Sequence, residues 1–267
     1  MRFLPLPVTP AEEKEVLAKL GKQALWAPHL ANWEAAYDAY HAAGGDPHVV
    51  VKSAFDKMTG AAQAKLYDTR RRTAQLEAIR RQTGLLSCPV CGSSSQGSLD
   101  HYLPKDEFGE FSIMRANLIP ACSHCNSDEK GTVYKGAGLA RLFHPYYDDW
   151  LDAALWRVRI LKPYAAPRFV PEPMPGLVAP RTAIVAFHIS TVVGRQFRIS
   201  MANWWSTLPN ALSVRLPPPV TGAALEAQLA QELAVSEATM GINSWQSAAL
   251  RGLVGDAMAA ADVLARL

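Results

Sequence analysis

Long apolar runs are missing from this sequence, and their absence narrows the kinds of protein it can encode. A membrane-spanning helix needs about 20 apolar residues, whereas the longest apolar stretch, residues 183–193, is short and contains His188. The first ten residues include Pro5, Pro7 and Pro10 and have no apolar core typical of a signal peptide. We therefore expect a soluble, cytoplasmic protein that does not act at a membrane.

Strong charge of either sign is also missing. The formal net charge is +3 over 267 residues, a mildly basic balance that permits nucleic-acid binding without requiring it. Internal repeats and low-complexity tracts are absent, and 49% of the residues are apolar, which excludes global disorder. The length suits one large domain or two small ones.

No cysteine lies outside two Cys-x-x-Cys pairs, Cys88/Cys91 and Cys122/Cys125. A disulfide framework is typical of short, cysteine-dense secreted chains, and this chain is neither short nor rich in cysteine. The spacing instead predicts one structural Zn²⁺ ion, because four thiolates fill a tetrahedron and leave no open position. The two pairs are separated by 30 residues, so the ion would join the ends of a long functional segment.

Residues 1–86 have the pattern of a helical region. Thr9-Pro10-Ala11-Glu12 forms a capping box with proline at the first helical position. A second helix is predicted over about 27–43, ending at Gly44-Gly45, and a third over about 54–82, with a possible break near Gly60.

The end of that third helix is basic. Residues 64–82 hold six basic side chains against two acidic ones, and the basic ones include Arg70, Arg71 and Arg72. Two interpretations of this basic segment have equal weight. It is either a solvated helix face or an arm that contacts the phosphates of a nucleic acid.

Residues 151–267 are predicted to be mostly helical. Residues 155–161 alternate like a strand, and the six prolines of 163–180 indicate an extended connection without regular structure. We expect a short strand and then a helix over 183–208. Two final helices are expected around 222–239 and 243–266, with Gly241 ending the first and Asn243 or Ser244 capping the second.

Residues 87–150 combine the cysteines with a second polar centre. Residues 98–105 indicate a strand that enters a loop, 111–120 a loop that enters a second strand, and 122–130 the start of a helix. Each junction carries polar side chains, namely Asp100, His101, Asn117 and Asn126.

This segment resembles the HNH endonuclease family, in particular the zinc-containing branch found among bacterial restriction and anti-phage nucleases. The resemblance covers about residues 86–147. Its matching residues are Leu99-Asp100-His101-Tyr102-Leu103-Pro104-Lys105, Asn117-Leu118-Ile119-Pro120-Ala121-Cys122, Cys125-Asn126 and Lys130. It implies an α+β fold: a small ββα-metal finger with a four-cysteine zinc site, flanked by mainly α-helical regions at both ends.

The chemistry expected of such a finger is metal-assisted hydrolysis of a phosphodiester. His101 is the expected general base, since imidazole accepts a proton near neutral pH. Asp100 and Asn126 offer hard oxygen ligands for a catalytic Mg²⁺ or Mn²⁺ ion. By resemblance, Asn117 ties the loop and orients His101, while Asn126 stands where the family often has histidine. Lys130 lies one residue farther from Asn126 than in the common family pattern.

Other polar residues have two interpretations each. Lys130 could contact substrate, although the longer spacing makes this role doubtful. His144, in an aromatic segment, could contact substrate or serve as a buried structural histidine, and His124 could contact phosphate or lie exposed on its helix.

Function is therefore predicted as an HNH-type endonuclease acting on nucleic acid, most simply DNA, as an anti-phage or restriction effector. The alternatives are a non-catalytic zinc module that binds nucleic acid or protein, and a nuclease that needs a partner. An ATPase, a reverse transcriptase or another defence component could dock on the helical flanks.

Overall fold

The computed structural model describes all of residues 1–267 and has an α+β architecture in which helices dominate. The α-helices are α1 (Pro10–Leu20), α2 (Leu30–Ala42), α3 (Lys57–Arg70), α4 (Ala74–Arg80), α5 (Arg181–Val192), α6 (Arg195–Ser213), α7 (Gly222–Met240), α8 (Trp245–Val254) and α9 (Ala257–Leu264). The strands are β1 (Ser98–His101), β2 (Leu118–Ala121), β3 (Trp156–Leu161) and β4 (Arg168–Pro173). Short 3₁₀ turns are η1 (Ala27–His29), η2 (Gly109–Phe111), η3 (Arg115–Asn117) and η5 (Asp149–Asp152), and η4 (His124–Glu129) is a π-helix.

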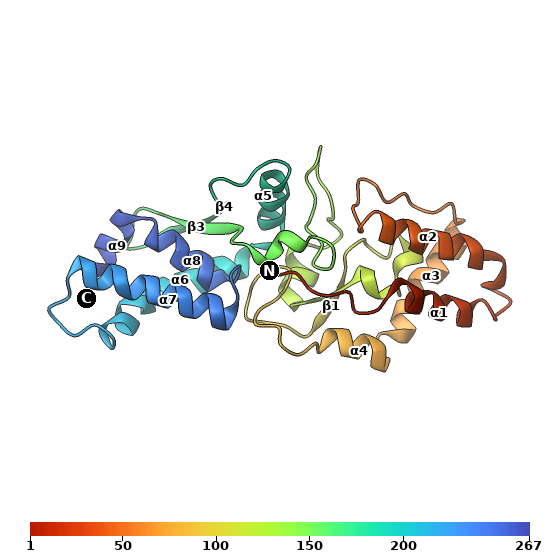
Figure 1. The fold of residues 1–267 in the computed structure, drawn as a ribbon, viewed down its shortest axis with the longest axis horizontal. Coiled ribbons are helices and arrows are strands. Elements are labelled where there is room, and N and C mark those ends of the chain that lie inside the picture. Colours follow the sequence, from red (N-terminus) through yellow and green to blue (C-terminus); the bar gives the residue numbers. More distant parts are fainter.

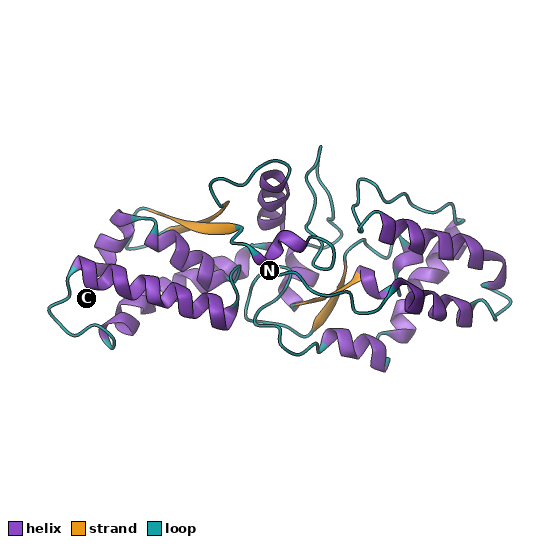
Figure 2. Cartoon of the chain, in the orientation of Figure 1, coloured by secondary structure: helices purple, strands orange, loops and turns teal.

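The molecule is elongated, with its N-terminal helices at one end and its C-terminal helices at the other (Figure 1). The β1–β2 pair lies between these two groups, and β3–β4 lies against the C-terminal helices (Figure 2). A single hydrophobic cluster of 52 buried residues runs from Met1 to Val263, so all three parts of the chain contribute to one core.

The N-terminal helices follow the predicted caps. The Thr9 side chain accepts from the backbone N–H of Glu12, and the Glu12 side chain accepts from the backbone N–H of Thr9, which confirms the capping box. The predicted break near Gly60 is wrong: α3 runs through Gly60, and the chain breaks instead at residues 71–73. A Cβ atom at position 109 would lie only 2.2 Å from the Gly60 carbonyl oxygen. Glycine at position 109 therefore allows its segment to pack closely on α3.

The strand β3 is confirmed, with Trp156, Val158 and Ile160 buried on one face. The prediction that 163–180 has no regular structure is wrong, because β4 pairs antiparallel with β3. Met174 N–H donates to the Leu155 carbonyl. Because hydrogen-bonding positions alternate along a strand, the nitrogens of Pro171 and Pro173 face the open edge of the sheet. Their lack of an N–H therefore costs no hydrogen bond between the strands.

The expected strand near residue 183 is also wrong, since the segment forms α5 and α6. Its buried residues recur at helical spacing; they are Ile184, Val185, His188, Ile189 and Val192. The final predicted helix is divided at Gly255 into α8 and α9, and Asp256 caps α9. Ser244, rather than Asn243, caps α8, and Gly241 ends α7 with φ +95°. No helix combines the length and apolar character that crossing a bilayer requires.

Candidate functional site

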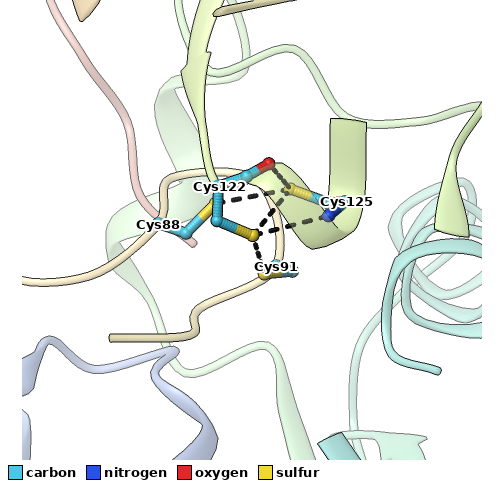
Figure 3. A group of neighbouring side chains, drawn as sticks. All are labelled: Cys88, Cys91, Cys122 and Cys125. Carbon is cyan, nitrogen blue, oxygen red and sulfur yellow. Dashed lines mark hydrogen bonds between the residues drawn. The ribbon is translucent and has the colours of Figure 1, made fainter. Parts of the chain in front are cut away.

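The four cysteines come together as predicted. All are buried, and their sulfur atoms lie within 4.8 Å of one another (Figure 3). The Sγ–Sγ distances are 3.6 Å for Cys88–Cys125, 3.6 Å for Cys91–Cys122 and 3.3 Å for Cys122–Cys125. In a tetrahedral zinc site with Zn–S bonds of about 2.3 Å, the sulfurs are about 3.8 Å apart. The cluster therefore has the ligand type and the size that hold a zinc ion.

The first cysteine turn is fixed against the C-terminal helices. Gly92 follows Cys91 with φ +82°, and a Cβ atom there would approach the Asn243 carbonyl to 2.3 Å. The Trp245 indole donates to the Cys91 carbonyl at 2.7 Å, and its backbone N–H donates to Gly92 at 3.0 Å. The metal cluster is thus continuous with the start of α8.

Between the cysteine pairs, β1 and β2 form a short antiparallel ladder in which Asp100 is opposite Ile119 and His101 opposite Leu118. The predicted order of strand, strand and helical turn is present, whereas its assignment to the HNH family stays a prediction. Adjacent side chains of β1 point to opposite faces. Ser98 and Asp100 face η4, while Leu99 and His101 face the helices α3 and α4.

His101 is held by contacts on two sides. Its Nε2 atom lies 2.9 Å from the Ser112 carbonyl oxygen, which can only accept, so Nε2 carries the proton and Nδ1 keeps a free lone pair. The Tyr67 ring packs edge-to-face on the imidazole, with ring centroids 4.5 Å apart. Burial lowers the pKa of His101 to about 4, which keeps the ring neutral and able to accept a proton at pH 7.

Asn117 is fully buried and uses both ends of its amide. Its Oδ1 accepts from Leu103 N–H at 2.8 Å and from the Tyr40 hydroxyl at 3.2 Å. Its Nδ2 donates to the carbonyls of Leu103 at 3.1 Å and Phe111 at 3.2 Å. These bonds tie together the loop between β1 and β2. They fix the Phe111 carbonyl, which directly precedes Ser112. They are the contacts that the predicted loop-tying role requires.

Asp100 is buried and forms an ion pair with Lys130, whose Nζ lies 3.2 Å from Oδ2 and also donates to the His101 carbonyl at 2.8 Å. Burial raises the pKa of Asp100 to about 6, although Lys130 opposes the shift. Only 2% of the Lys130 side chain is exposed, so the predicted substrate contact by this residue is not what the structure shows.

The π-helix explains how Lys130 reaches this position. Its N–H bonds to the Cys125 carbonyl at 3.0 Å, five residues earlier, so the turn holds one residue more than an α-helical turn. The extra residue between Asn126 and Lys130 is absorbed inside the turn, and the ammonium faces β1.

Asn126 lies on the same face of β1 as Asp100. Its Nδ2 donates to the Ser98 hydroxyl at 2.9 Å, and its Oδ1 accepts no hydrogen bond from the protein. A carboxylate and a free amide oxygen on one face fit the hard ligands that Mg²⁺ and Mn²⁺ prefer, although Lys130 competes for the carboxylate. No contact joins Asn126 to the His101 ring, which lies on the opposite face; the structure does not bring these two side chains together.

The arginines of the basic segment 64–82 differ in their ion pairing. Arg80 and Arg81 both pair with Glu77, whereas no carboxylate lies within 4.0 Å of Arg70, Arg71 or Arg72. The unpaired arginines are at the end of α3 and are partly or fully exposed.

His144 is enclosed in the core, which supports its structural interpretation and not substrate contact. Its Nε2 lies 2.9 Å from the Tyr40 hydroxyl, and its Nδ1 accepts from Tyr146 N–H at 3.2 Å. Burial holds its pKa well below the usual value. His124, by contrast, is partly exposed and lies 3.5 Å from Asp128.

Two residues at this site, Tyr67 and Ser112, were not predicted from the sequence. Tyr67 is 34 positions before His101 and contacts it only through the fold. Ser112 takes part through its backbone carbonyl, which no residue type reveals.

Buried neutral histidines make acid lability an expected property of this fold. His188 stacks on the Phe143 ring, accepts a hydrogen bond from the Phe143 N–H and forms a hydrogen bond with the Val90 carbonyl. Burial lowers the pKa of His188 to about 3. The unfolded chain takes up a proton below about pH 6.5, so stability falls with pH between about 6.5 and 3. At pH 5.5 this histidine costs on the order of 1 kcal/mol.

Urea unfolding at pH 7.5 and 5.5 measures this effect. The loss of unfolding free energy between the two pH values should be smaller in His188→Gln than in wild type by on the order of 1 kcal/mol. Equal losses in both proteins would contradict the prediction.

Comparison with known proteins adds one partial match. The chain is 44% identical over 62 residues to protein ea31 of Escherichia phage lambda, a match that covers 23% of this chain and 21% of that protein. The aligned part is thus about a fifth of the relative's length. No protein-family model and no solved structure matches the chain.

Proposed function

We propose that this protein is a metal-dependent endonuclease of the HNH type that hydrolyses phosphodiester bonds in DNA. The observation that carries the proposal is the orientation of His101. Its Nε2–H is fixed on the Ser112 carbonyl, its Nδ1 lone pair is free, and its pKa favours the neutral ring at pH 7. A neutral ring with a free lone pair can accept a proton from water, and a pKa of about 4 makes it a weaker base than free imidazole.

In the proposed reaction, His101 Nδ1 removes a proton from water while the water oxygen bonds to phosphorus. The P–O bond to the leaving nucleotide breaks, and the leaving oxygen takes a proton from solvent. Asn117 keeps the loop that carries the Ser112 carbonyl in place, so the ring holds one tautomer and one direction. Lys130 holds the backbone of His101 and balances the charge of Asp100. Asp100 and Asn126 are the predicted ligands of a Mg²⁺ or Mn²⁺ ion, but Lys130 pairs with Asp100 and both ligands lie on the face of β1 opposite the His101 ring, so no step of the reaction is assigned to that ion.

The structural role of zinc is part of the proposal. Four sulfur ligands leave no position for water, so the ion would act by fixing the ends of the segment that carries His101. The biological role we propose is that of an anti-phage or restriction effector. Its helical flanks provide surfaces for a partner such as an ATPase, a reverse transcriptase or another defence component.

A non-catalytic zinc module is the second candidate, and one observation favours it. Lys130 already pairs with the carboxylate of Asp100, and the amide of Asn126 and the ring of His101 lie on opposite faces of β1. Such a module would bind nucleic acid or protein without cutting it.

Plasmid cleavage with Mg²⁺ or Mn²⁺ separates the two candidates. We expect His101→Ala to lower the cleavage rate about 1,000-fold or more, since it removes the general base. Zinc content and melting temperature should stay near wild type. The matched control is His48→Ala, which removes an exposed histidine outside the site.

A wild-type protein that holds zinc but cuts neither DNA nor RNA with any divalent metal would favour the non-catalytic module. Cleavage that appears only after co-expression with a neighbouring gene product would instead favour the partner-dependent nuclease.

A further inference from the structure

The helix α3 reaches the candidate base from outside the segment between the cysteines. Its residue Tyr67 packs edge-to-face on His101 at 4.5 Å between centroids, on the side of β1 away from Lys130. The imidazole is therefore held between this ring and the Ser112 carbonyl. The Tyr67 hydroxyl makes no hydrogen bond within the protein, so the ring alone provides the contact.

The same part of α3 is joined to the loop that follows β1. Lys105 lies four residues after His101; its Nζ is 2.8 Å from Asp68 and 5.4 Å from the centroid of the Tyr67 ring. The Ser112 hydroxyl donates to the Gln63 carbonyl at 2.6 Å. The end of α3 is thus positioned by both arms of the loop that holds the imidazole.

Arg70 and Arg71 lie three and four residues after Tyr67, so they share its face of the helix. Lys105 occupies the nearby carboxylate of Asp68 and lowers its pKa through a hydrogen bond. With no acidic partner within 4.0 Å, the arginines form an unpaired cationic group about one helical turn after Tyr67, the residue that packs on the candidate base. A guanidinium group in this state matches the charge and shape of a backbone phosphate.

We propose that the end of α3 belongs to the catalytic site, with Tyr67 as a positioning residue for His101 and with Arg70 and Arg71 binding DNA phosphates beside the scissile bond. This inference rests on the proposed nuclease function. It also predicts the path of the DNA: the DNA strand crosses the last turn of α3 and enters the site on the His101 face of β1.

Phosphate binding is tested with the double variant Arg70→Gln/Arg71→Gln of the full-length protein and a fluorescent DNA duplex. Each lost phosphate contact should reduce the slope of log K against log salt by about 1, so the slope falls by about 2. Affinity at 0.1 M salt should fall about 10-fold or more. The control is Arg198→Gln, which removes an exposed, unpaired arginine on α6. Binding and salt slope that match this control would overturn the phosphate contact.

Positioning by Tyr67 is tested by separating kcat from KM. Tyr67→Leu keeps apolar packing but loses the ring, and we expect kcat to fall about 10- to 100-fold with KM and DNA affinity unchanged, because a small displacement of a reacting group is costly. Tyr67→Phe should restore wild-type kcat. A Phe variant as slow as Leu, or a Leu variant that changes only KM, would overturn the positioning role.

Failure of the nuclease function and failure of the role of α3 give different results. A wild-type protein without nuclease activity overturns the proposed function and the role of Tyr67 with it, while the binding measurement still decides the arginine contact. An active wild-type enzyme whose Arg70/Arg71 and Tyr67 variants behave like Arg198→Gln overturns only the inference about α3.

Discussion

Zinc removal should unfold the centre of this protein. Metal binding to four thiolates supplies on the order of 10 kcal/mol to folding, more than the total stability of many domains. The cluster also holds the turn at Cys91 and Gly92, to which Trp245 is bonded at the start of α8. Loss of the ion should therefore spread into the C-terminal helices as well as into the β1–β2 pair.

Cys125→Ser and treatment with a strong chelator give two independent measurements. We expect zinc content to fall to near zero and the melting temperature to fall by more than about 10 °C, with a change in tryptophan fluorescence. Ser123→Ala and Ser127→Ala are matched controls, because both side chains are exposed next to the cluster. A Cys125→Ser protein that keeps its melting temperature would show that the cluster does not support the fold through a metal.

Asn117→Ala should be the most damaging substitution away from the cysteines. It removes four buried hydrogen bonds at once and leaves the Leu103 N–H and the Leu103 carbonyl without partners, whereas the Phe111 carbonyl keeps Met114 N–H and the Tyr40 hydroxyl keeps His144. Each unsatisfied group costs about 1–3 kcal/mol, so we expect a loss of about 4 kcal/mol and a melting temperature lower by about 10 °C.

The same substitution should affect chemistry, because the loop it releases carries the carbonyl that orients His101. We expect cleavage to fall about 100-fold in protein that still holds zinc. Asn117→Asp should be nearly as harmful, since its second oxygen would face the carbonyls of Leu103 and Phe111. Asn210→Ala, on the exposed face of α6, is the control. Full activity of folded Asn117→Ala would show that the loop does not orient the base.

Local patterns predicted the parts of the fold that depend on neighbouring residues. The capping box at Thr9, the end of α7 at Gly241 and the alternation of β3 all lie within a few residues of the signals that predicted them. The prolines of β4 and the β-branched residues of α5 misled the prediction. In both segments, the decisive factor was an open sheet edge or a buried helix face supplied by the rest of the chain.

The π-helix at η4 shows a different limit. The sequence gives the spacing from Cys125 to Lys130, but only packing decides whether those residues form a loop, an α-helical turn or a wider turn. Here the cysteine cluster fixes one end of the turn and the Asp100–Lys130 pair fixes the other. The additional residue is therefore held within the helix, where it costs one shifted hydrogen bond.

The sequence by itself determined the cysteine cluster: residue type and short spacing suffice there, because four thiolates in two Cys-x-x-Cys pairs have few uses other than binding a metal. For Asn117 the sequence offered only the resemblance to the HNH family, and its burial and its four hydrogen bonds are features of the fold. Tertiary structure alone decided that His101 faces α3 while Asp100 faces η4, and that Tyr67 packs on the imidazole. Those contacts join residues 30 or more positions apart, and only the burial of a common core brings them together.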